Sequence, residues 1–203
     1  MAVAILAVAI LHSLLPPELK LQSSPYLPWI TLAFLVVLIM LDPGRIDRLS
    51  TASRIVTDVL IGLLTLSNAY AAAMLVIGIV NNDSFAEPNV LLFAGGAVWV
   101  SNAVLFALWY WDLDQGGAAA RANGGNGLPA FVFPEMQHTE HVPAGWRPMF
   151  VDYLAYSFAT AMAFSPTDVS AIRPWAKLLV VIESIISLGL AALVIARAIN
   201  VIT

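Results

Sequence analysis

Long apolar runs, separated by short polar or proline-containing breaks, dominate the chain and predict membrane-spanning helices. Runs of this kind cover about residues 1–15, 26–41, 52–80, 89–111 and 174–200. A helix that crosses a bilayer needs roughly 20 consecutive apolar residues, and we interpret all five runs as spans, the first of them short. The fourth run ends in Trp109-Tyr110-Trp111-Asp112, which is typical of an aromatic belt at the membrane surface.

The first run could instead be a secretory signal or an interfacial helix. A signal begins with a positively charged segment and ends in a small-residue cleavage site. No lysine or arginine precedes Lys20, and Pro16-Pro17 follows the run directly. We therefore interpret residues 1–15 as a retained first span.

A sixth apolar segment, from Phe150 to Ala163, is too short to cross a bilayer. Its 14 residues would form a helix about 21 Å long, against a hydrocarbon core of about 30 Å. The polar turn Ser165-Pro-Thr-Asp168 follows it. Non-helical backbone at membrane depth is tolerated only where protein or a water-filled cavity surrounds it. The segment therefore predicts a re-entrant half-helix.

These elements predict an all-α integral membrane protein with about five transmembrane helices and a re-entrant half-helix before the last span. Residues 1–112 would form a four-helix membrane region, 113–148 a hydrophilic or interfacial loop, and 149–203 the half-helix, the turn and the last helix. The glycines in the first half of the loop predict flexibility. Its aromatic and polar second half predicts a position on the membrane surface.

Composition strengthens the membrane interpretation. Of the 203 residues, 60% are hydrophobic and 11% charged, and the mean hydropathy is +0.86, whereas ordinary soluble domains are about a quarter charged. The net charge of −4 and the absence of a basic stretch exclude a nucleic-acid partner. The sequence has no cysteine, so it has no disulfide or thiolate nucleophile. We expect a multi-pass protein of the cell membrane, in contact with the lipid bilayer.

Residues 157–178 resemble the pore region of tetrameric potassium channels. In that family a pore helix ends in Ser-x-x-Thr-Ala-Thr-Thr-Val-Gly-Tyr-Gly-Asp, and a Trp-Gly-Arg-Leu opens the inner helix after six further residues. The matching positions here, without gaps, are Ser157, Thr160, Ala161, Asp168, Trp175, Ala176, Lys177 and Leu178. The resemblance covers about a quarter of the chain, from Met149 onward. It implies a pore-loop fold and a homo-oligomer, most simply a tetramer.

The chain departs from that family at the selectivity filter, where Ala163-Phe164-Ser165-Pro166-Thr167 replaces Thr-Val-Gly-Tyr-Gly. Potassium filters align backbone carbonyls along the pore, a geometry that depends on glycine. Proline fixes φ and donates no hydrogen bond. A carbonyl filter for potassium is therefore disfavoured. A wider polar ring near Thr160 would instead consist of the Ser165 and Thr167 hydroxyls and the Asp168 carboxylate. Such a ring favours inorganic cations. The alternative without a pore is that Ser165–Asp168 is only a turn that starts the last helix.

Glu183 lies about ten residues into the last span, where an unpaired carboxylate is costly and usually functional. With Ser184, Ser187 and Gly189 it would line a pore if the last helix does so. Alternatively, Glu183 is buried at a helix–helix contact against Asn68, Asn102 or another polar group. The residues alone leave both alternatives open.

A metal or catalytic site is not predicted. His138, Glu140 and His141, with Glu135, contain the ligand types that zinc uses, but their spacing matches no strong signature. The glycine-rich residues 116–127 lack the lysine and the strand–turn–helix context of a phosphate loop. We therefore expect no enzyme activity and no cofactor.

The sequence gives conflicting evidence on membrane orientation. With five spans and a potassium-channel topology, seven of the nine lysines and arginines would face outside, and only Lys20 and Arg197 inside. The positive-inside rule favours the reverse. An inverted pore loop, entering from the cytoplasm as in glutamate-receptor channels, would satisfy it.

The sequence therefore predicts an ion-channel-like membrane protein, a weakly selective cation pore without a glycine-based potassium filter. The alternative is a non-conducting scaffold or accessory subunit that keeps the pore-domain fold. The signatures Ala-Phe-Ser-Pro-Thr-Asp and Ala-Arg-Ala-x-Asn also resemble those of a group of uncharacterised bacterial membrane proteins, which implies a bacterial membrane.

Overall fold

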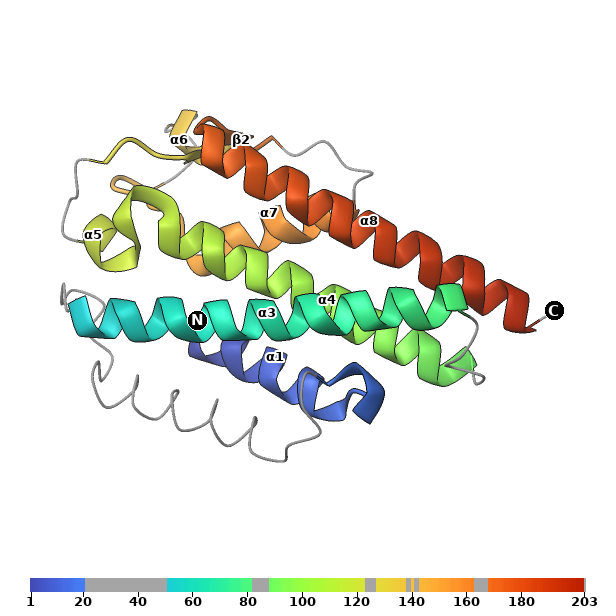
Figure 1. Cartoon of the computed structure of the whole chain (residues 1–203). Helices are drawn as coiled ribbons and strands as arrows, with labels where there is room; N and C mark the ends of the chain where they lie inside the picture. The colour runs from blue at the N-terminus through green and yellow to red at the C-terminus, as the bar shows by residue number, and fades with distance from the viewer. Residues whose placement is uncertain are drawn as a thin grey trace.

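The computed structural model describes residues 1–20, 51–81, 88–122, 127–137, 140, 143–162 and 168–202. Most of them are helical (Figure 1). The long helices are α3 (Thr51–Asn81), α4 (Pro88–Leu113) and α8 (Pro174–Ile202), and the 13-residue helices are α1 (Ala2–Leu14) and α7 (Phe150–Met162). The short elements are η1 (Pro17–Leu19), η2 (Asp114–Gly116), α5 (Ala118–Ala122), β1 (Phe131–Val132), α6 (Pro134–Gln137) and β2 (Ser170–Ala171).

Three helices of the described residues are long and apolar enough to cross a membrane: Arg54–Asn81, Asn89–Gly116 and Pro174–Ile199. The helices predicted over 52–80, 89–111 and 174–200 are thus confirmed. Helix α1 confirms a first apolar helix, but its 13 residues make it only about 20 Å long. The run 26–41 lies outside the described residues.

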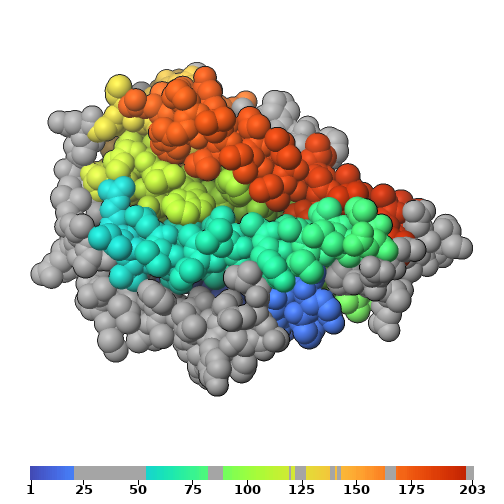
Figure 2. All heavy atoms as spheres, in the orientation of Figure 1, coloured from blue at the N-terminus to red at the C-terminus, as the bar shows by residue number. Residues whose placement is uncertain are grey.

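Helix α4 is the centre of the bundle and contacts α1, α3, α7 and α8 (Figure 1). Within the apolar stretches, 67% of α4 is buried, against 33% of α3 and 22% of α8. Helices α3 and α8 lie on the surface seen in Figure 2. Their exposed side chains include many large apolar ones, among them Leu63, Leu66, Leu188, Ile195 and Ile199. Such faces suit contact with lipid.

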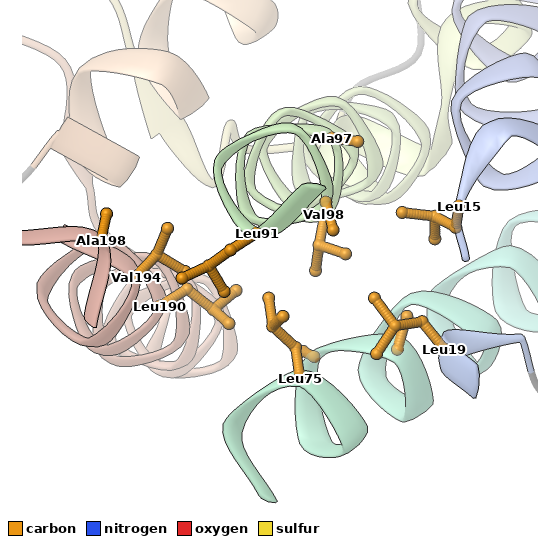
Figure 3. Packing of buried hydrophobic residues seen from close by; sticks show 12 residues of the cluster. Leu15, Leu19, Leu75, Leu91, Ala97, Val98, Leu190, Val194 and Ala198 are labelled. Carbon is orange, nitrogen blue, oxygen red and sulfur yellow. The ribbon is translucent and has the colours of Figure 1, made fainter. Parts of the chain in front are cut away.

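Two apolar clusters hold the long helices together. One joins the end of α1 and η1 to α3, α4 and α8, and its members Leu75, Leu91 and Val194 point toward one another (Figure 3). Helices α4 and α8 approach closely here, because a Cβ added to Gly95 would lie 2.7 Å from a methyl of Val194. The other cluster joins the first half of α1 to α3 and α4 through Ile5, among others.

A third, aromatic cluster ties the interhelical loop to α7 and α8. Phe131 of β1 packs with Tyr110 of α4, Tyr153 of α7 and Ala176 of α8. Strands β1 and β2 pair antiparallel, with Phe131 opposite Ala171. Helices α7 and α8 therefore both begin at the end of the bundle where α4 ends.

The second half of the loop after α4 packs part of its aromatic side chains inside the protein. We expected this half to lie on the membrane surface, and within the chain Phe131 and Phe133 are buried. The pairing of β1 with β2 satisfies backbone hydrogen bonds of the loop, so that its aromatic side chains can enter the protein interior. In the first half, η2 and α5 are regular structure, and residues 123–126 lie outside the described residues.

Candidate functional site: polar contacts inside the bundle

Glu183 is fully buried where α4, α7 and α8 meet. The hydroxyl of Tyr110 on α4 donates to its Oε2 atom over 2.5 Å. The hydroxyl oxygen of Ser157 on α7 is hydrogen-bonded to Oε1 and lies 2.6 Å from the backbone carbonyl oxygen of Ala103. One carboxyl group thus connects three helices.

A second polar contact lies one turn further along α8. The amide of Asn102 on α4 donates to the Ser187 hydroxyl over 3.0 Å, and both side chains are buried. Because residues four apart share a helix face, Glu183 and Ser187 both point toward α4. Ser184 is half-buried, as is Gly189.

This placement bears on the two alternatives for Glu183. Glu183 and Ser187 have no exposed surface in a single chain, so they face the interior of that chain rather than a space between copies. Glu183 lies at a helix–helix contact, the second alternative, although its partners are Tyr110 and Ser157 rather than Asn68 or Asn102. A pore between copies would have to be lined by other residues of α8.

A third polar contact attaches α1 to α3. The His12 ring nitrogens lie 3.2 Å from the Ser67 hydroxyl and 3.0 Å from the Asn68 Oδ1 atom. All three side chains are buried. A neutral imidazole has one donor and one acceptor nitrogen, so it can donate to the Asn68 oxygen and accept from Ser67. These bonds compensate for burying a polar ring in an apolar helix.

At the end of α4, Asp114 anchors the interhelical loop to α7. Its carboxylate accepts hydrogen bonds from the Ala130 amide and the Tyr153 hydroxyl, both over 2.6 Å. The guanidinium of Arg121 donates to the Asp114 backbone carbonyl and lies 5.4 Å from the centre of the Tyr153 ring. A buried carboxylate with these donors fixes the position from which α7 starts.

The residues predicted for the constriction are only partly described. Thr160 is buried in α7, and Asp168 is exposed. Ala163, Phe164, Ser165, Pro166 and Thr167 lie outside the described residues. Of the residues predicted for the constriction, the structure therefore describes only Thr160 and Asp168.

The weak metal candidates are not assembled in the part of the chain that the structure describes, which contains no group of three or more histidine, aspartate or glutamate side chains able to hold a metal ion. His138 and His141 lie outside the described residues. Glu140 is described and exposed.

No protein-family model, curated protein or solved structure matches this chain. The resemblance to potassium-channel pore regions therefore depends on the residues quoted above.

Several residues of these contacts were not predicted as site residues. We assigned Tyr110 to a surface aromatic belt, but it is fully buried, because the loop and α7 cover the end of α4. The sequence contained one signal for this contact, because the Tyr110 hydroxyl lies four residues before Asp114 on an otherwise apolar helix face. His12 lies in an apolar run of the sequence, and a lone buried imidazole requires a polar partner.

Proposed function

We propose that this chain is a subunit of an ion-channel-like membrane protein, a weakly selective cation pore of the pore-loop type. The observation that carries the proposal is the course of the chain around α7. This helix is 13 residues long, about 20 Å, and α8 begins again at the end of the bundle where α7 began. An apolar segment that enters and returns without crossing is what a pore loop requires.

Among the described residues, the far end of the bundle is filled by aliphatic side chains. There α1, η1, α3, α4 and α8 meet in one apolar cluster (Figure 3). Packed aliphatic side chains exclude water and ions. An ion path would therefore run between copies of the chain, which supports a homo-oligomer, in line with the tetramer that the resemblance implies.

Charge in the proposed pore loop supports cation preference. Asp168, the last residue of the predicted turn, is exposed, and rings of carboxylates favour cations. In a four-fold assembly each copy would contribute one such carboxylate. The basic residues Arg54, Arg121, Arg147, Arg173 and Lys177 belong to segments at the same end as the start of α7, whereas Lys20 and Arg197 belong to the other. The positive-inside rule then favours entry of α7 from the cytoplasmic side.

Flux measurements on purified protein in liposomes test the proposal. We expect potassium and sodium flux in the wild type and a clear loss of cation-over-anion preference in Asp168→Asn. Glu18→Gln is the matched control, because it removes an exposed carboxylate in η1, at the other end of the bundle. Absence of flux in several salts and at several voltages would contradict conduction.

One observation favours the alternative, a non-conducting scaffold or accessory subunit with the same helix arrangement. Glu183 and Ser187 are engaged inside the chain, and the outward face of α8 is apolar. Such a protein would show no flux and would co-purify in a stable complex with another membrane protein through residues 113–148. Detection of that complex in the absence of flux would support this alternative.

A further inference from the structure

The hydroxyl of Ser157 has two hydrogen-bond acceptors but only one hydrogen. Its oxygen lies 2.6 Å from the backbone carbonyl oxygen of Ala103 and is hydrogen-bonded to Oε1 of Glu183. A carbonyl oxygen carries no hydrogen, and neither does an ionised carboxylate. Two oxygens at this separation need a hydrogen between them, since 2.5–3.0 Å is the O–H···O range.

Both contacts of the Ser157 oxygen contain a hydrogen only if Glu183 supplies the second one. We propose that Glu183 is an uncharged carboxylic acid and that its proton lies between Oε1 and Ser157. Ser157 then donates to the Ala103 carbonyl, and Tyr110 donates to Oε2. In this arrangement every hydroxyl hydrogen has one acceptor. The ligand of this intramembrane site is a proton.

The surroundings of Glu183 agree with an uncharged acid. Among the described residues, its hydrogen-bond partners are the hydroxyls of Tyr110 on α4 and Ser157 on α7, and no basic side chain is hydrogen-bonded to it. Tyr156 of α7 is the further titratable neighbour. An ionised carboxylate without a cationic partner is costly in a membrane interior.

Asp114 is the internal contrast. It is also fully buried, but its carboxylate oxygens face only donors, the Ala130 amide and the Tyr153 hydroxyl. Neither of these contacts requires a hydrogen from Asp114. The contacts of Asp114 therefore need no hydrogen of its own, and Arg121 donates to its backbone carbonyl.

The proton makes Glu183 a hydrogen-bond donor, a role that an ionised carboxylate cannot have. As a donor it aligns Ser157 between α8 and α4, so that α7 is bonded to both long helices through one residue. This inference does not depend on whether the protein conducts ions, and it applies equally to a scaffold.

Infrared spectroscopy of the purified wild type in lipid tests the proposal, because the C=O stretch of a protonated carboxyl group is separate from the carboxylate bands. We expect the difference spectrum between the wild type and Glu183→Gln to contain the protonated-carboxyl band of one group per chain. The matched control Asp114→Asn should lose carboxylate absorption instead.

Ser157→Ala keeps the test decisive if Glu183→Gln fails to fold. It removes the acceptor of the Glu183 proton, so the protonated band should move to higher wavenumber. It should also lower the melting temperature by about 4–8 °C, as expected for loss of two buried hydrogen bonds in a chain of this length. A wild type without a protonated-carboxyl band, or a band that Glu183→Gln and Ser157→Ala both leave unchanged, would overturn the proposal.

Discussion

Removal of the Tyr110 hydroxyl tests the contact that joins α4 to α8. Tyr110→Phe deletes one oxygen and keeps a ring that packs against Phe106, Phe131 and Tyr156, with centroid separations of 6.1, 4.8 and 5.5 Å. Packing is thus retained, and the loss is confined to the 2.5 Å hydrogen bond to Glu183.

The expected destabilisation follows from what the variant leaves behind. Oε2 of Glu183 would be buried without a donor, and an unsatisfied buried acceptor costs about 1–3 kcal/mol. In a chain of this length, 1 kcal/mol corresponds to a shift of about 2–4 °C in melting temperature. A cost of about 2 kcal/mol would lower the melting temperature by about 4–8 °C.

Thermal unfolding in mild detergent, followed by intrinsic fluorescence, measures this shift. Tyr70→Phe is the matched control, because it removes a tyrosine hydroxyl from α3 that is not hydrogen-bonded to Glu183, and it should change the melting temperature little. A double-mutant cycle with Glu183→Gln should give a coupling energy, since the two side chains are in contact. Equal melting temperatures for Tyr110→Phe and Tyr70→Phe would refute the reasoning.

Three further predictions use the same unfolding measurement. Asn102→Ala should destabilise the protein by about 1 kcal/mol, because Ser187 loses its 3.0 Å partner; no change would show that the pair contributes nothing. Gly95→Ala should cost about 1–3 kcal/mol of stability, because the new Cβ would lie 2.7 Å from Val194. Gly96→Ala should instead stabilise the protein by up to about 1 kcal/mol, because nothing lies within 4 Å of its new Cβ. Equal effects of the two variants would contradict the close packing of α4 on α8. His12→Leu should cost about 1 kcal/mol through the loss of two hydrogen bonds to α3, and an unchanged or raised melting temperature would show that α1 is held by apolar packing alone.

Helix boundaries were the most predictable part of the fold. Helix α4 runs from Pro88 to Leu113 against a predicted 89–111, and α8 begins at the predicted Pro174. Polar or proline-containing breaks end each apolar run, and such breaks act locally. The short helix α7 was predictable for the same reason.

Contacts between helices were much less predictable. A glutamate in an apolar run indicates that a partner exists, but the partner depends on how the neighbouring helices are rotated. Tyr110 and Ser157 meet Glu183 only because α7 starts beside the end of α4. The burial of Phe131 depends on its pairing with Ala171, a contact between segments far apart in the chain that no local pattern encodes.

The most direct test of the central claim is the membrane sidedness of the two ends of the pore-loop segment. The chain has no cysteine, so single cysteines at exposed positions can be labelled with a membrane-impermeant maleimide without a background. Ala144→Cys lies before α7, Ser170→Cys after it, and Asn81→Cys at the far end of α3. We predict that positions 144 and 170 are labelled from the same side of the membrane and position 81 from the opposite side. Labelling of positions 144 and 170 from opposite sides would show that α7 crosses the membrane and would contradict the pore-loop account.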